Sequence, residues 1–263
     1  IPEISRVYIQ LNADRFIKKG KRPEDLIYQP QFHFADMKWE FSDWMFLEYL
    51  SNPQRAAELF AQKWLLEILP EAVFVGEEDD VHVSIKKGFA FIVDPIDGTT
   101  NFIKDYHVSA ISVGLAKDGE KYIGVVYNPY LDEMFTAERG KGAFLNGRPI
   151  HVSRNPLSEG IVLFGTAPYY EELSKKSFQM AYAYFKKALD VRRSGSAAID
   201  LCSIAAGRAE LYFELRLSPW DFAAGALIVE EAGGVVTTVE GGAVTLGQKC
   251  SVLATNGRCG RLE

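Results

Sequence analysis

The spacing of apolar residues predicts a helix after an irregular beginning. Up to about residue 47 no single periodicity holds, and the aromatic stretch from Phe32 to Phe46 predicts no regular element. From Asn52, a suitable N-cap, apolar residues recur at three- and four-residue steps. They are Ala57, Phe60, Trp64, Leu65 and Ile68. Pro53 suits the first helical position and Pro70 predicts the end of this helix.

Two regions of different texture follow the helix. Short apolar runs joined by turns predict a largely antiparallel group of strands at Phe89–Val93, Val108–Ala116, Tyr122–Tyr127 and Met134–Glu138. Beyond about residue 150 strands and helices alternate, at 161–164, 171–189, 197–206, 211–214, 219–232 and 235–238. We therefore expect a layered α+β and α/β sandwich, with an α+β region over residues 1–150 and an α/β region over residues 151–263.

Composition narrows the class of protein. A chain of 263 residues with 48% hydrophobic content is long and apolar enough to bury a sizeable core. Its net charge of -6 argues against a basic surface that grips nucleic acid. Three cysteines without C-x-x-C spacing suggest neither a disulfide framework nor a zinc site, which fits a reducing cytoplasm. Neither a membrane span nor a signal peptide is evident, so we expect a cytoplasmic protein that does not bind membranes.

The candidate chemistry begins in the octet that runs from Asp94 to Asn101. Its sequence, DPIDGTTN, directly follows an apolar strand, so we expect exposed carboxylates on a rigid base. Pro95 fixes one backbone angle and Gly98 permits a sharp bend, which lets Asp94, Asp97 and Thr99 converge. Two close carboxylates favour a cation between them, and hard oxygen ligands suit Mg²⁺. The alternative is that the two acids only cap a turn.

Two further acidic residues become candidate metal ligands when they are considered together with that octet. Glu77 opens the run Glu77-Glu78-Asp79-Asp80 after an apolar segment, and a solvated loop is its ordinary explanation. Asp221 lies in the first turn of a helix capped by Ser218, where an acid also complements the helix dipole. That structural role and metal binding are compatible for Asp221.

Four motifs in order resemble the inositol monophosphatase family, especially its bacterial broad-specificity members. They are GEE, DPIDGTTNF, GSAA and PWDFAAGALIVEEAGG, and the resemblance covers about residues 48 to 257. It implies the inositol monophosphatase and fructose-1,6-bisphosphatase fold, Mg²⁺ as cofactor in two or more ions, and a homodimer.

The resemblance also implies roles for individual residues. Glu77, Asp94 and the Ile96 carbonyl would bind one Mg²⁺, and Asp94, Asp97 and Asp221 a second. Glu77 and Thr99 would orient the attacking water, which makes them catalytic residues together with Asp97.

Further residues are implied to bind the substrate. The backbone at Gly98 and Thr99 would hold the phosphate. Glu214, Asp221 and the run Gly195-Ser196-Ala197 would contact the rest of the substrate. The alternatives are that Glu214 is a surface acid at a strand end and that the run only caps a helix.

The chain departs from the family pattern at two places. Gln54 stands where relatives have the last Asp of an Asp-x-Val-Thr-x-x-Asp segment, which puts a third metal position and lithium sensitivity in doubt. Lys104-Asp105 stands where relatives usually have His-Gly, so we expect a differently shaped pocket there.

We therefore expect Mg²⁺-dependent hydrolysis of a small phosphorylated polyol or sugar, most simply inositol monophosphate. The same chemistry would suit a fructose-1,6-bisphosphatase, a histidinol-phosphatase or a 3′-phosphonucleotide phosphatase. Glu214 favours a polyol. A non-catalytic regulatory or binding protein that keeps the fold is the alternative of a different class.

Overall fold

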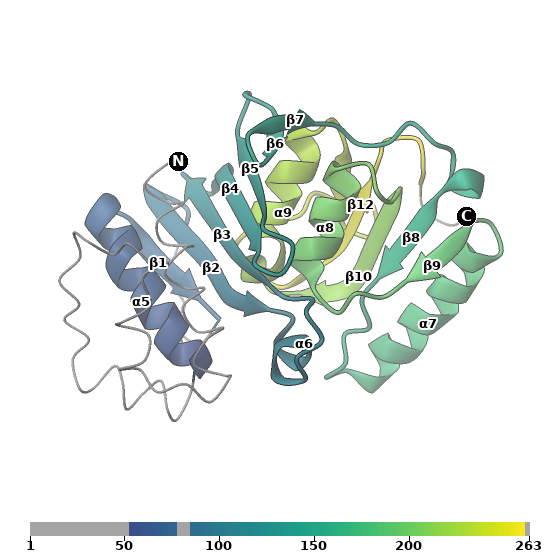
Figure 1. Ribbon diagram of the computed structural model, residues 1–263, viewed down its shortest axis with the longest axis horizontal. Coiled ribbons are helices and arrows are strands. Elements are labelled where there is room, and N and C mark those ends of the chain that lie inside the picture. Colours follow the sequence, from purple (N-terminus) through teal and green to yellow (C-terminus); the bar gives the residue numbers. More distant parts are fainter. Residues whose placement is uncertain (1–52, 78–84, 261–263) are drawn as a thin grey trace. The chain divides into compact units, whose positions relative to one another are not determined.

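The computed structural model describes residues 53–77 and 85–260 (Figure 1). The segment 32–46, the predicted cap Asn52 and the acids at 78–80 lie outside the described residues. The chain divides into two compact units between Pro70 and Glu71. The predicted boundary at residue 150 falls inside the second unit, and as a domain boundary it stays a prediction.

The described part of the first unit contains helix α5, Pro53–Ile68. The periodicity predicted this helix and its end near Pro70. Its buried apolar positions are Ala57, Ala61 and Leu65, which recur every four residues, and Glu58 is buried beside them in the helix. Ile68, which we expected on the apolar face, is exposed because it lies at the frayed last turn.

The second unit begins with a seven-stranded sheet in which the strands follow their order in the chain. Its strands are β1 (Val73–Gly76), β2 (Phe89–Asp97), β3 (Ala110–Lys117), β4 (Glu120–Asn128), β5 (Glu133–Glu138), β6 (Ala143–Leu145) and β7 (Arg148–Ile150). Only β1 and β2 pair in parallel; the later pairs are antiparallel. The predicted antiparallel group is therefore confirmed, with β1, β6 and β7 added to it.

A five-stranded mixed sheet is formed by the second half of the chain. Its order is β11-β12-β10-β8-β9, with β8 (Ile161–Phe164), β9 (Asp190–Arg192), β10 (Leu211–Leu217), β11 (Val235–Thr237) and β12 (Cys250–Thr255). The helices of the second unit are α6 (Thr99–Ile103), which follows β2, and, in the second half of the chain, the 3₁₀ turn η1 (Leu157–Glu159), α7 (Glu171–Phe185), α8 (Ala197–Ala205) and α9 (Pro219–Glu231). The predicted alternation is confirmed with two exceptions: the helix expected over 171–189 ends at Phe185 and is followed by β9, and β12 was not predicted.

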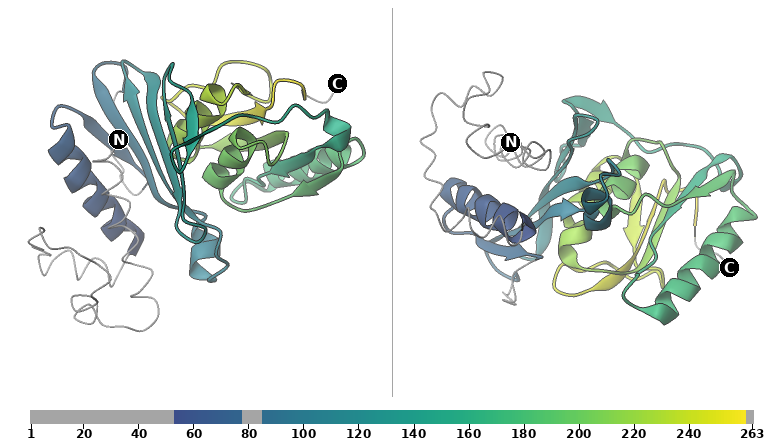
Figure 2. Two further views of the ribbon diagram at one scale, coloured as in Figure 1. Left: turned by 45° about the horizontal axis from the view of Figure 1, so that its top comes forward. Right: turned by 60° about the horizontal axis from the view of Figure 1, so that its bottom comes forward.

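Helices α8 and α9 lie side by side between the two sheets, and α7 covers the outer face of the five-stranded sheet (Figures 1 and 2). Helix α9 packs on β2 to β5, while α8 contacts α9, β10 and β12. The approach of α9 is close because two strands present glycine to it: a Cβ on Gly124 would lie 2.6 Å from the Ala224 carbonyl oxygen, and one on Gly114 3.0 Å from the Ala223 Cβ. This layering carries the first turns of α8 and α9 to the end of β2.

Candidate active site

A bulge in β2 places two carboxylates on one face of the sheet. In the pairing with β3, Asp94 lies opposite Ser112 and Asp97 opposite Ala110, so β2 contains one residue more than its partner. Residues three apart on a regular strand face opposite sides, but the extra residue returns Asp97 to the side of Asp94. Pro95 fits there because it has no amide hydrogen to donate to the ladder.

Both carboxylates are buried, and the expectation that they would be exposed was wrong. Asp94 is 3% exposed and Asp97 is 7% exposed. The reason is that β2 continues through the DPID segment as a strand rather than ending before it, and the helices between the sheets cover it.

Glu77 and Asp221 lie close enough to Asp94 to act on its charge. The parallel register pairs Gly76 with Val93, so Glu77 follows β1 beside Asp94. The pKa of Asp94 is raised well above its ordinary value, first by burial and then by the charges of Glu77, Asp97 and Asp221. Glu77 itself is exposed, as the solvated-loop interpretation expects, but its charge acts on Asp94.

Asp221 lies in the first turn of α9 and caps this helix. Its Oδ2 accepts a 2.6 Å hydrogen bond from the Ser218 backbone amide, which completes the predicted cap of this helix. Burial raises the pKa of Asp221 well above its ordinary value, and the charges of Asp97 and Glu77 raise it further.

Asp97 is held by the first turn of α8. Its Oδ2 accepts hydrogen bonds from the Ser196 hydroxyl and, at 2.9 Å, from the Ala198 backbone amide. Burial raises the pKa of Asp97 to about 6, although the hydrogen bonds from Ser196 and Ala198 oppose this shift.

The chemistry of this donor set fits a hard divalent cation. In the described part of the chain, however, no three His, Cys, Asp or Glu side chains converge on one metal position. One oxygen each of Asp94, Asp97 and Asp221 accepts from an internal donor, namely the amide of Ile96, the donors on α8 and the amide of Ser218. Buried acids that repel one another are stabilised when a cation compensates their charge, and carboxylate oxygens are ligands that Mg²⁺ prefers.

Gly98 and Thr99 form the sharp bend that the sequence predicted. Gly98 has a φ of 86°, and a Cβ there would lie 2.9 Å from the Val108 carbonyl oxygen, so only glycine fits. The Thr99 hydroxyl, expected to orient the attacking water, donates at 3.2 Å to the Ile96 carbonyl oxygen, which was expected at the first metal position.

In the structure, the run expected to contact the substrate caps a helix. Ser196 is the N-cap of α8 and accepts from the Ile199 amide at 3.2 Å, so the capping interpretation of Gly195-Ser196-Ala197 is confirmed. Contact of this run with a substrate stays a prediction.

Glu214 lies within β10 and not at its end, so its interpretation as a strand-end surface acid was wrong. Its two carboxylate oxygens accept from the Ala167 amide at 3.0 Å and from the Tyr212 hydroxyl at 2.8 Å. Burial raises the pKa of Glu214, and Arg193 nearby opposes this shift. Its contact with substrate hydroxyls also stays a prediction.

Two further polar residues of this region carried no predicted role. Asp200 is buried in α8, where burial raises its pKa well above the ordinary value and Ser194 lowers it. An acid within the apolar run of α8 was the signal that could have identified it. Asn101 belongs to the octet itself and bridges to Ser194, a contact 93 positions away that no local pattern reveals.

The residues that depart from the family pattern lie at the start of α5 and just after α6. Gln54 is in the first turn of α5, and the weakened third metal position stays a prediction. Lys104-Asp105 follows α6, and Asp105 has a φ of 54°, the left-handed conformation that glycine adopts more readily.

Comparison with known proteins decides the family. The inositol monophosphatase family model matches residues 49–261. The chain belongs to this family. It is 40% identical over 196 residues to the inositol-1-monophosphatase of Rhizobium meliloti, covering 74% of each chain. It is 39% identical over 196 residues to a Vibrio cholerae protein named Nus factor SuhB, covering 74% of this chain and 73% of the relative.

A solved structure supports the fold. The crystal structure of SaIMPase-II bound to inositol monophosphate is 31% identical and superposes with a TM-score of 0.72, over 81% of this chain and 82% of the other. The expected layered fold is therefore confirmed for this family member. Among the described helices, none has both the length and the apolar character that crossing a membrane requires.

Proposed function

We propose that this protein is a Mg²⁺-dependent phosphatase that hydrolyses a small phosphorylated polyol, with inositol monophosphate as the first candidate. One observation carries the proposal: the charges of Glu77, Asp97 and Asp221 all raise the pKa of the buried Asp94, so acids from three separate segments of the chain act on one carboxylate. Such a cluster is costly in an empty site and useful in one that holds cations.

Each residue of the proposed site would have a defined role in binding or catalysis. Glu77, Asp94, the Ile96 carbonyl, Asp97 and Asp221 would hold two Mg²⁺ ions. When bound, Mg²⁺ supplies a field that lowers the pKa of water and stabilises charge on the phosphoryl and leaving oxygens. Thr99 and Glu77 would orient the attacking water, and the backbone amides at the bend of Gly98 would bind the phosphate.

Support for the substrate class comes from Glu214 and from the relatives. Glu214 is half-buried, the charge of Arg193 acts on it, and its oxygens retain lone pairs that can accept from substrate hydroxyls. A relative of the same fold was crystallised with inositol monophosphate. The fructose-1,6-bisphosphate, histidinol phosphate and 3′-phosphonucleotide alternatives share the metal chemistry and differ in the leaving group. We further propose a cytoplasmic homodimer, which light scattering after gel filtration would test.

The test measures phosphate release from a panel of these four substrates with Mg²⁺ and with EDTA. We expect release only with Mg²⁺, highest with inositol 1-phosphate, and lower by about 100-fold or more in Asp94→Asn. Asp132→Asn is the matched control, because Asp132 lies on the β4–β5 turn, where its carboxylate accepts from the Tyr127 hydroxyl. Equal activity of wild type and Asp94→Asn would refute the proposed site.

A second candidate function follows from the names of other relatives. Several curated relatives are named Nus factor SuhB, and Gln54 replaces an expected acid. A folded wild-type protein that releases no phosphate from any member of the panel would favour a binding protein of that kind over an enzyme.

A further inference from the structure

Two loops that are almost one hundred residues apart in the chain lie backbone to backbone at the candidate site. A Cβ on Gly98 would lie 3.3 Å from the Gly195 carbonyl oxygen and 3.3 Å from the Ser196 Cβ. Both glycines have a φ of 86°. One loop carries Thr99 and the bend expected to hold phosphate, and the other carries the run expected to face the rest of the substrate.

Asn101 connects these two loops with its side-chain amide. Its Nδ2 donates to the Val108 carbonyl oxygen at 2.7 Å and to the Ser194 carbonyl oxygen at 2.9 Å. Both amide hydrogens are therefore used, one on the segment that follows α6 and one on the loop that precedes α8. An amide is the side chain that can donate twice in this way without bringing a charge.

Further hydrogen bonds connect the 194–196 loop to Asp97. The Ser194 hydroxyl accepts from the Ser196 amide at 3.0 Å, and the Ser196 hydroxyl donates to Asp97. The backbone from Asp97 to Asn101 completes this closed set of connections. Asp97, the bend, Asn101 and the 194–196 loop therefore brace one another.

We propose that Asn101 is a positioning residue, which fixes the 194–196 loop against the Gly98–Thr99 bend and so keeps Asp97 in its working orientation. The proposal rests on the proposed function for its kinetic consequence, but not for its structural one. Loss of the two hydrogen bonds leaves the Ser194 and Val108 carbonyl oxygens unsatisfied and lets the loops separate. Misplacement of about 1 Å at a reacting centre lowers rate by about 100-fold.

The choice of substitutions separates hydrogen bonding from packing. Asn101→Asp keeps the size of the side chain but turns acceptors towards two carbonyl oxygens, whereas Asn101→Ala removes the donors without adding charge. If the donors matter, Asn101→Asp is at least as damaging as Asn101→Ala, and kcat falls about 10- to 100-fold with a smaller change in KM. If Asn101 only fills space, Asn101→Leu, which keeps about the same size without donors or charge, behaves like wild type and the proposal fails.

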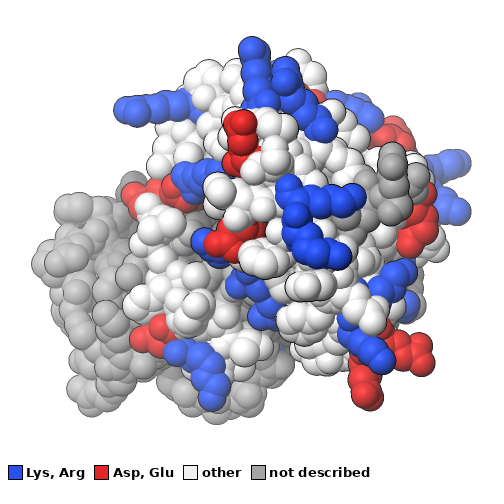
Figure 3. Space-filling view, turned by 90° about the vertical axis from the view of Figure 1, so that its right-hand side faces the viewer, with Lys and Arg blue, Asp and Glu red and all other residues white. Residues whose placement is uncertain are grey.

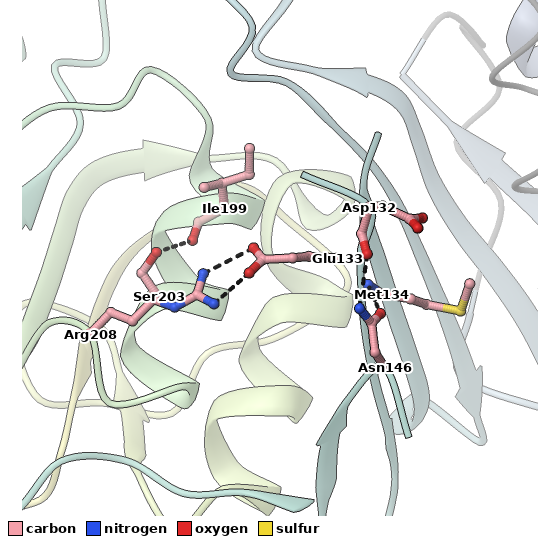
Figure 4. Close-up of polar contacts among 7 residues, drawn as sticks. All are labelled: Asp132, Glu133, Met134, Asn146, Ile199, Ser203 and Arg208. Atoms are coloured by element: carbon pink, nitrogen blue, oxygen red, sulfur yellow. Dashed lines mark hydrogen bonds and ion pairs between the residues drawn. The ribbon is translucent and has the colours of Figure 1, made fainter. Parts of the chain in front are cut away.

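A matched control lies in the turn between β6 and β7. There the Asn146 Nδ2 donates to the Asp132 carbonyl oxygen at 2.9 Å and its Oδ1 accepts from the Met134 amide at 2.7 Å (Figure 4). Asn146→Asp makes the same atomic change as Asn101→Asp in an exposed turn. We expect wild-type kcat and KM for Asn146→Asp.

A readout without catalysis distinguishes this proposal from the proposed function. The Ala198 amide donates to Asp97 and the Ser196 amide donates to Ser194, so we expect both amides to be protected from hydrogen exchange. We expect Asn101→Asp and Asn101→Ala to exchange faster than wild type over residues 194–198, and Asn146→Asp to match wild type there. Unchanged exchange and kinetics in the Asn101 variants would overturn the proposal, while an inactive wild type with faster exchange in the variants would overturn only the proposed function.

Discussion

A single methyl group on β4 should displace the helix that carries Asp221. In Gly124→Ala the new Cβ would lie 2.6 Å from the Ala224 carbonyl oxygen and 3.2 Å from two further backbone atoms of Ala224. Ordinary contact begins at 3.4 Å, so α9 must retreat by roughly 0.8 Å or the strand must bend. The obstacle is backbone of a buried helix, which cannot rotate away as a side chain can.

The expected cost follows from overpacking in a buried site. Extra methylenes in well-packed cores destabilise by about 1 to 3 kcal/mol, and we expect Gly124→Ala to lower the free energy of unfolding by that amount. Because Asp221 lies in the first turn of α9, the same shift should also raise the Mg²⁺ concentration needed for half-maximal phosphatase activity.

The assay is urea unfolding of metal-free protein, followed by circular dichroism. Gly247→Ala is the matched control, because a Cβ there meets nothing within 4 Å and Gly247 does not have a positive φ. We expect Gly247→Ala to lie within about 0.5 kcal/mol of wild type. A Gly124→Ala variant as stable as wild type would refute the close packing of α9 on β4.

Two more predictions concern charge. Because burial raises the folded-state pKa of Asp97 to about 6 from an ordinary 3.8, the folded metal-free protein binds more protons than the unfolded chain between those pH values. The stability contributed by protonated Asp97 is therefore lost as the pH rises from about 4 to about 6, and Asp97→Asn should gain stability relative to wild type over that window in urea unfolding. A constant difference between the two proteins would contradict this. Arg208, which follows α8, donates two hydrogen bonds to Glu133 on β5, at 2.9 and 2.5 Å (Figure 4), so Arg208→Met should lower the free energy of unfolding by about 0.5 to 1 kcal/mol. Its kcat/KM should equal that of wild type, and a loss of activity would show that this contact reaches the site.

The surface around α7 shows that the net charge of the chain does not reveal how charged side chains are distributed. Lys and Arg side chains are scattered among uncharged residues on the face shown in Figure 3, although the whole chain carries a charge of -6. Six basic and three acidic residues occur between Tyr169 and Arg193. The net charge therefore does not describe this face, and its distribution required the structure.

Strong local signals allowed much of the fold to be predicted. Pro53 and the recurring apolar positions located α5, and Ser218-Pro219 located the start of α9. The short strands β1, β6, β7 and β9 were missed because three or four residues carry little periodicity, and the six-residue strand β12 was missed as well. One of them was readable: Asn146-Gly147 is a hairpin signal between β6 and β7, and both residues have positive φ.

The sequence predicted which residues form the candidate site, but not how they are buried and hydrogen-bonded. The motifs named Asp94, Asp97 and Asp221, but burial of the first two depends on a bulge and on helices from the second half of the chain. The same holds for Asn101 and Ser196, whose hydrogen bonds join loops that are distant in sequence. Tertiary pairing of this kind leaves no local periodicity.

The central claim is that the acids around Asp94 bind Mg²⁺, and calorimetric titration of Mg²⁺ into metal-free protein at pH 7.5 tests it most directly. The account predicts saturable binding to wild type that weakens by about tenfold or more in Asp94→Asn and in Asp221→Asn, but not in Asp132→Asn. Equal Mg²⁺ affinity in all four proteins, or no binding to the folded wild type, would contradict it.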